Sequence, residues 1–87
     1  MTASPRPPVH LLRNTPVRSL IKGLQRDGFS LERETQTGGR IYYHPDGRIV
    51  VIHYHRGRDI LTRKTLQSVL EGTRWDEVDL RRLDLLK

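Results

Sequence analysis

The chain has 87 residues, with 16 Lys and Arg against 10 Asp and Glu, a formal net charge of +6, and no cysteine. This length fits one small domain, and the lack of cysteine excludes a disulfide framework, a Cys-ligated zinc site and thiol catalysis. No apolar run approaches the roughly 20 residues of a membrane span and no secretory leader is evident, so we expect a cytoplasmic protein without a membrane segment.

The positive charge is concentrated in the first part of the chain. Residues 1–70 carry 12 of the 16 Lys and Arg but only 5 of the 10 acidic residues. Arg outnumbers Lys by 13 to 3, and the planar guanidinium group suits phosphate and base edges. A positive field attracts polyanions, above all nucleic acid. An ordinary solvated surface is the alternative, and the charge alone favours nucleic-acid contact by a small margin.

The first 14 residues are predicted to form a flexible tail. Three prolines among the first eight residues disfavour a helix and a central strand there. The first helix is predicted to begin at Thr15-Pro16, because Thr is a good N-cap and Pro suits the first helical position. Gly28 is placed to end this helix. Its apolar stripe consists of Val17, Leu20, Ile21 and Leu24.

Three segments of alternating apolar and polar residues follow and predict three strands. They cover residues 29–32, 40–44 and 49–55, and the turn signal Pro45-Asp46-Gly47 separates the last two. The short connections predict antiparallel hairpins. The predicted buried face of the sheet consists of Phe29, Leu31, Ile41, Tyr43, Val50 and Ile52.

A second helix is predicted to begin after Thr62, a plausible N-cap, and to end near Gly72. A third, shorter helix is expected near Asp76, within an extension over residues 73–87. We therefore expect one α+β domain over residues 15–72, with element order α-β-β-β-α and two helices on one face of a three-stranded antiparallel sheet. The helical extension follows this domain.

Several segments, in this order, resemble the HicA toxin family, also called YcfA-like. They are the amphipathic helix that ends at Gly28-Phe29, the segment GGRIYYHPDG at residues 38–47, VIHYH at residues 51–55 and TLQSVL at residues 65–70. The resemblance covers roughly residues 16–72. It implies a double-stranded-RNA-binding-domain-like fold and an mRNA interferase that cleaves RNA without a metal or other cofactor. It also implies a HicB antitoxin as partner.

One position departs from the family pattern. The family's second strand follows a Gly-Ser-His sequence whose His is taken to be catalytic, and Gly39 occupies that position here. Metal-free RNA cleavage needs a base for the 2′-OH and an acid for the leaving oxygen, and glycine supplies neither. Three interpretations stay open: a ribonuclease toxin that uses another His, an inactive member that keeps RNA or antitoxin binding, and an interaction protein without a nucleic-acid partner.

His53 is the first candidate to replace the missing His. A four-residue turn over residues 45–48 would pair Arg40 with His53 and place Glu32 in the same row on the open face of the sheet. In this hypothesis Arg40 holds the scissile phosphate. The alternative is a solvated charge ladder of little energetic value.

His55 is the second catalytic candidate, because the family pattern shares it and two arginines lie close by in the sequence. A hydrogen bond at the strand end is its alternative role. His53 and His55 have no third ligand near them in the sequence, so no metal site is predicted.

The predicted RNA-binding residues are cations and one aromatic side chain. Arg63 and Lys64 begin the second helix, where backbone N–H groups also attract phosphate. Tyr42, on the predicted open face, is expected to stack on a base. Ordinary surface charge is the alternative for each cation. The set consists of Lys22, Arg40, Tyr42, Arg56, Arg58, Arg63 and Lys64.

Overall fold

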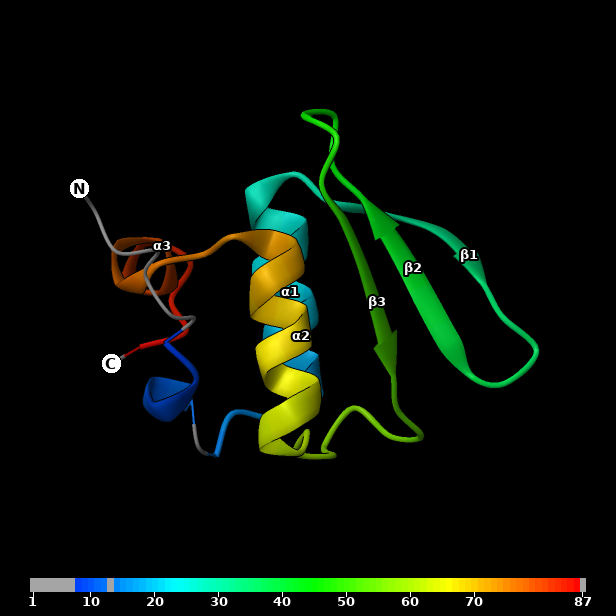
Figure 1. Cartoon of the computed structure of the whole chain (residues 1–87), viewed down its shortest axis with the longest axis horizontal. Helices are drawn as coiled ribbons and strands as arrows, with labels where there is room; N and C mark the ends of the chain where they lie inside the picture. The colour runs from blue at the N-terminus through cyan, green and yellow to red at the C-terminus, as the bar shows by residue number, and fades with distance from the viewer. Residues whose placement is uncertain (1–7, 13, 87) are drawn as a thin grey trace.

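The computed structural model describes residues 8–12 and 14–86. In chain order it contains η1 (Val9–Leu12), α1 (Val17–Asp27), β1 (Ser30–Glu34), β2 (Gly39–Tyr43), β3 (Ile49–His53), α2 (Arg63–Thr73) and α3 (Glu77–Arg82). The strands form one antiparallel sheet in the order β1-β2-β3. The predicted α+β fold with its α-β-β-β-α order and its C-terminal helix is confirmed (Figure 1).

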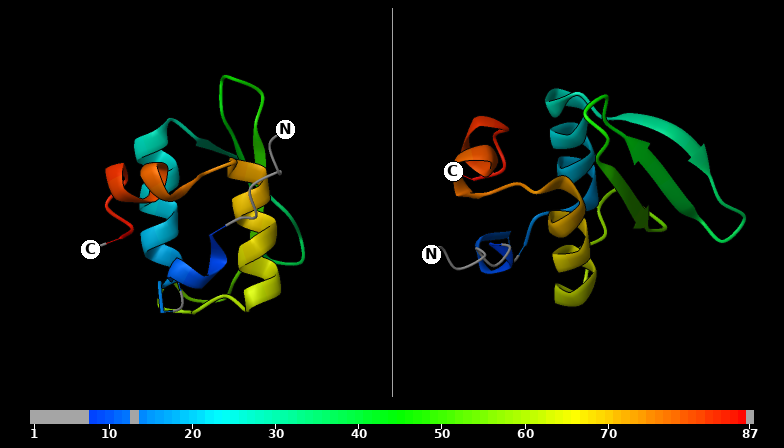
Figure 2. Two further views of the ribbon diagram at one scale, coloured as in Figure 1. Left: turned by 60° about the vertical axis from the view of Figure 1, so that its left-hand side comes forward. Right: turned by 45° about the horizontal axis from the view of Figure 1, so that its top comes forward.

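The elements are arranged in three layers. Helices α1 and α2 form the middle layer, with the sheet on one side of them and η1 and α3 on the other (Figures 1 and 2). The extension approaches α1 closely at Gly23, where an added Cβ would lie 3.0 Å from Leu85 Cδ1. Among the residues that the structure describes, no element covers the face of the sheet that points away from the helices (Figure 1). Across the described part of the chain, none of the helices has the length and apolar character that crossing a membrane requires.

The start of α1 differs from the prediction in how it is capped. The N-cap residue is Pro16, and no side chain caps the helix. Instead, the N–H groups of Val17 and Arg18 donate to the carbonyl oxygens of Asp59 and Gly57, each at 2.8 Å. The free donors of this helix end are therefore satisfied by the loop between β3 and α2. The other end is as predicted, since Gly28 adopts a left-handed conformation with φ of 105°.

The pairing of β2 with β3 corrects the predicted faces of β2. Tyr42 pairs with Val50 and Gly39 with His53, one residue away from the predicted register. A shift by one residue turns every side chain to the opposite face. Tyr42 is therefore buried at 3% exposure, whereas Tyr43, predicted to be buried, is 46% exposed.

The physical reason for this shift is a connection one residue longer than predicted. The His44 N–H donates to the Arg48 carbonyl at 2.9 Å, so His44 belongs to the turn rather than to the strand. Its ring keeps it there, because Nδ1 accepts from the Asp46 N–H and Nε2 lies 2.7 Å from the carbonyl oxygen of Asp27.

Strand β1 departs from the prediction in a second way. A β-bulge lies between Leu31 and Arg33, where the register with β2 shifts. Leu31 was predicted to be buried but is exposed, because β1 is the edge strand farthest from the two helices (Figure 1). Phe29, Val50 and Ile52 are buried as predicted.

The predicted tail also differs from the structure over its last residues. Val9–Leu12 form a 3-10 helix, and Val9 and Leu12 are buried in the core. These apolar side chains cover part of the helix layer, so this segment packs on the domain. Residues 1–7 and 13 of the predicted tail lie outside the described residues.

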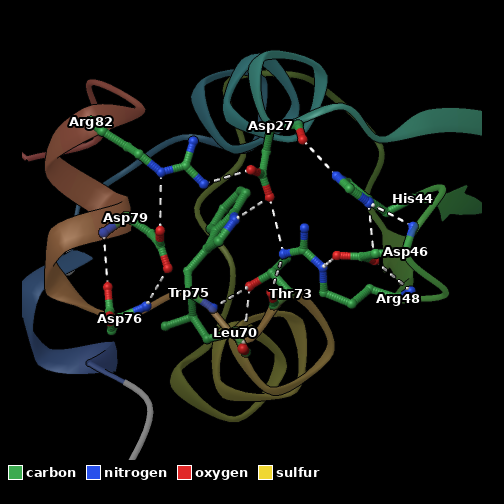
Figure 3. Close-up of polar contacts among 10 residues, drawn as sticks. All are labelled: Asp27, His44, Asp46, Arg48, Leu70, Thr73, Trp75, Asp76, Asp79 and Arg82. Carbon is green, nitrogen blue, oxygen red and sulfur yellow. Dashed lines mark hydrogen bonds and ion pairs between the residues drawn. The ribbon is translucent and has the colours of Figure 1, made fainter.

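Asp27, the last residue of α1, connects four parts of the chain (Figure 3). Its carboxylate is 6% exposed and accepts hydrogen bonds from Arg82 at 2.6 Å and from the Trp75 indole at 2.9 Å, and Arg48 lies 3.0 Å away. Burial raises the pKa of Asp27, but the hydrogen bonds from Arg82 and Trp75 and the charge of Arg48 outweigh burial and bring it below its ordinary value. This cluster ties the end of α1 to the β2–β3 turn, to the end of α2 and to α3.

Candidate nucleic-acid interface

The loop between β3 and α2, residues 54–62, forms one end of the domain together with the first turns of α1 and α2 (Figure 1). We call this region the loop end. Its anchor is Asp59, whose carboxylate accepts from the backbone N–H groups of Arg56 at 2.8 Å and His55 at 3.1 Å. These backbone hydrogen bonds, the one from Arg56 first, lower the pKa of Asp59. With the two bonds from α1, they fix the course of the loop.

The loop end carries exposed cations that no carboxylate of the described residues pairs. Within residues 8–12 and 14–86, their side chains form no ion pair. These cations are Arg18, Arg56, Arg58, Arg63 and Lys64. Lys22 lies one turn further along α1 and is also exposed and without an ion pair among the described residues. By contrast, Arg48 and Arg82, near the opposite end, pair with Asp27.

Both candidate histidines line one cavity at the loop end. The cavity has a volume of about 380 Å³, within the size range of small-ligand sites, and lies between the end of β3 and the start of α2. Its lining consists of His53, Tyr54, His55, Asp59, Ile60, Leu61, Thr62 and Thr65. Thr62 caps α2 as predicted, through a hydrogen bond that its hydroxyl accepts from the Thr65 N–H at 3.2 Å. The fold thus brings two imidazoles and the free cations to the same end.

His53 lies directly opposite Gly39 on the open face of the sheet. A Cβ added to Gly39 would lie 2.7 Å from His53 Nε2 and 2.8 Å from Thr35 Oγ1. The imidazole of residue 53 therefore occupies the space that a side chain at residue 39 would need. The Thr35 hydroxyl also holds the start of β2, since it accepts from the Gly39 N–H at 2.9 Å.

Two residues of the predicted RNA-binding set lie elsewhere. Arg40 pairs with Ile52 rather than with His53, so the predicted row of Glu32, Arg40 and His53 is wrong. The Arg40 guanidinium stacks 4.3 Å above the Tyr54 ring and its Nε lies 3.3 Å from Glu34. It is therefore engaged on the helix side of the sheet.

The burial of Tyr42 has the same cause, the shifted register of β2. Its ring is part of the hydrophobic core, packed with residues of the helices and of β3. A buried ring cannot stack on a base, so Tyr42 is removed from the candidate interface.

Arg18 belongs to the loop end but was not predicted. It lies beside the loop, because a Cβ added to Gly57 would be 3.4 Å from the Arg18 Cβ. The only sequence signal was its place in the first turn of a helix. The contact itself depends on the loop folding back on α1, which local patterns do not encode. Over the residues that the structure describes, His, Asp and Glu side chains form no group of three or more suited to a metal ion.

Comparison with protein families gives a match that covers most of the domain. Residues 17–74 match the family model described as the HicA toxin of bacterial toxin–antitoxin. The matched segment runs from the first residue of α1 to just beyond α2, so it includes the whole sheet and the loop end. None of the curated proteins compared with the chain matches it.

Proposed function

Because the chain belongs to the HicA toxin family of bacterial toxin–antitoxin systems, we propose that it is a toxin that binds RNA through its loop end. The observation that carries this proposal is that five exposed cations, which form no ion pair among the described residues, lie at the same end of the domain as the cavity lined by His53 and His55. When guanidinium and ammonium groups bind phosphates, the counterions condensed on the nucleic acid are released. This release supplies most of the affinity of a protein for a polyanion. The first turn of α2 adds backbone N–H groups that also favour phosphate.

The proposed activity is metal-independent endoribonuclease cleavage of mRNA. His53 takes the role of the His that the family pattern has at the position of Gly39. In this reaction a base takes the proton of the 2′-OH, whose oxygen attacks the adjacent phosphorus. The 5′-oxygen leaves with a proton from an acid, which yields a 2′,3′-cyclic phosphate and a 5′-OH. Imidazoles suit both roles near neutral pH, and His53 and His55 line the same cavity.

A second candidate function is an inactive family member that keeps RNA or antitoxin binding. The observation that favours it is Gly39 itself, which has no proton to transfer. Under either function the proposed partner is a HicB-like antitoxin, and the mRNA target implies a cytoplasmic protein.

The first experiment measures RNA binding at several salt concentrations. A variant that replaces four loop-end cations with Ala is expected to bind more weakly and to lower the slope of log K against log salt by up to about 3 for single-stranded RNA. The substitutions are Arg56→Ala, Arg58→Ala, Arg63→Ala and Lys64→Ala. The control is Arg81→Ala, which removes a single exposed cation, one that pairs with Glu77 on α3. Equal slopes for the wild type and the fourfold variant would refute RNA binding at this end.

The second experiment separates the two candidate functions. If His53 is the catalytic imidazole, His53→Ala lowers the rate of RNA cleavage by at least about a hundredfold, the usual contribution of general acid–base catalysis. RNA affinity is expected to stay close to that of the wild type. A wild-type protein that binds RNA without cleaving it would establish the inactive alternative instead.

A further inference from the structure

The open face of the sheet carries a continuous group of apolar side chains. Ile41 pairs with Val51 and Tyr43 with Ile49, so the four side chains stand next to each other on two neighbouring strands. We call this group the apolar face. Tyr43, Ile49 and Val51 are each close to half exposed. No element of the described chain covers this side of the sheet, as Figures 1 and 2 show.

The apolar face is hollowed and has a polar rim. A cavity of about 420 Å³ lies over it, lined by the four apolar side chains and by Glu32 and Arg33. The bulge in β1 brings these two consecutive residues to the same cavity, although consecutive residues of a regular strand point to opposite faces. One carboxylate and one guanidinium leave the rim neutral. An apolar hollow rimmed by polar groups is typical of a protein–protein contact.

We propose that the apolar face is the docking surface for the antitoxin, an inference that rests on the proposed function of the chain as the toxin of such a pair. RNA is disfavoured as its occupant, because RNA interfaces are rich in cations and, among the described residues, Arg33 alone supplies a cation to the lining of this cavity. The remaining large exposed apolar side chains of the described residues, Leu31, Ile60 and Val78, belong to three different elements or loops and form no comparable group.

Charge defines the kind of partner further. The chain has a net charge of +6, so an acidic partner is steered toward it and favoured over a basic one. The segment that fits carries apolar side chains for the hollow and a carboxylate for Arg33, which forms no ion pair within the described residues.

The two proposed surfaces meet at His53. Ile49, Val51 and His53 follow each other on the same face of β3, and alternate residues of a strand are about 7 Å apart. A partner seated on Ile49 and Val51 therefore lies next to the imidazole. Antitoxin and RNA are expected to compete, although their binding depends on different side chains.

The test uses the full chain and the purified product of the reading frame beside its gene. Ile49→Lys combined with Val51→Lys is expected to weaken binding of this protein at least about tenfold, because two charges enter an apolar contact. The control Val78→Lys adds one lysine at an apolar residue of α3 that is 69% exposed, and binding is expected to stay within about twofold. RNA affinity of the double variant should not fall, since every loop-end cation remains.

A second variant, Tyr43→Ser, keeps the test valid if the two lysines disturb the sheet, and it is expected to weaken partner binding in the same direction. Unchanged partner affinity in both variants overturns the proposal. So does a wild-type chain that does not bind the neighbouring gene product, or one that forms a dimer that Ile49→Lys and Val51→Lys abolish, because the occupant is then a second copy. The salt titration of RNA binding judges the proposed function separately.

Discussion

The absence of a side chain at Gly39 and the position of the imidazole of His53 depend on each other. The His53 ring fills the space beside Gly39, and the family pattern expects the imidazole on the residue that is glycine here. Only a residue without Cβ leaves this space to its cross-strand neighbour. The proposed catalytic group therefore lies on β3, directly opposite the residue of β2 where the family resemblance places the imidazole.

This dependence predicts an energetic coupling between the two positions. Gly39→Ala places a Cβ 2.7 Å from His53 Nε2, too close for a normal contact. We expect Gly39→Ala to be about 1 kcal/mol less favourable in the wild type than in a His53→Ala background, as contacting residues usually couple. Urea unfolding of the two single variants and the double variant measures this difference. Strict additivity would show that the ring is not held beside Gly39.

Asp59 allows a test of the loop anchor with two similar variants. Asp59→Asn and Asp59→Ala both remove the negative charge, but only Asn keeps an oxygen that can accept from the N–H groups of Arg56 and His55. We expect the Ala variant to bind RNA roughly threefold more weakly than the Asn variant, the effect of losing about one hydrogen bond. RNA titration of both proteins gives the comparison. Equal affinities would mean that binding does not depend on the fixed course of the loop.

Among the helices and strands, the chain order could be predicted because it follows from local patterns. Apolar residues at helical spacing define α1 and α2, and alternation defines the strands. Gly28 and Thr62 mark a helix end and a helix start in the way their backbone and hydroxyl groups require.

The faces of β2 could not be predicted in the same way. They depend on whether His44 belongs to the strand or to the turn, and contacts of its ring with Asp46 and with the carbonyl oxygen of Asp27 decide this. Asp27 is 17 residues away in the sequence. The predicted faces of Arg40 and Tyr42, both on β2, were therefore reversed. His53 and His55 do not lie on β2, and they were correctly predicted to lie outside the core.

Among the polar contacts, the Asp27 cluster is expected to make the largest contribution to the free energy of unfolding. Asp27→Asn leaves Arg48 and Arg82 without their shared carboxylate, although each keeps a second one, Asp46 and Asp79. We therefore expect a loss of about 2 kcal/mol, the usual effect of removing hydrogen bonds to a charged group. Denaturant unfolding measures the loss. The control Asp84→Asn changes a carboxylate that is 79% exposed and 4.0 Å from Arg26, so we expect a change below about 0.5 kcal/mol. A similar loss in both variants would contradict the central position of Asp27.

For the protein as a whole, charge is divided between two ends with different roles. Near the Asp27 end, Arg48 and Arg82 are paired with carboxylates and hold elements together. At the loop end, the cations of the β3–α2 loop and of the first turn of α2 have no such partners among the described residues and remain available to phosphate. Stability and RNA affinity are therefore expected to respond to different sets of substitutions and to different conditions.

Acid should reveal this division. The pKa of Asp27 is lower in the folded state than its ordinary value, so the unfolded state binds the proton more readily. The stability that this group contributes is present above the ordinary Asp pKa of about 4 and is lost as the pH falls through the folded pKa. Thermal unfolding between pH 7 and pH 2 should show a decline below about pH 4 that is reduced in Asp27→Asn. An equal decline in both proteins would assign the acid sensitivity to other carboxylates.

The placement of the single tryptophan gives the protein a built-in optical reporter. Trp75 is buried and its indole N–H is bound to Asp27, in the part of the molecule remote from the loop end and from the apolar face. Its fluorescence will follow the opening of the Asp27 cluster in acid or denaturant. Binding of RNA or antitoxin at the proposed surfaces will leave this fluorescence nearly constant. Tryptophan fluorescence can therefore distinguish a variant that no longer binds its ligand from a variant that no longer folds.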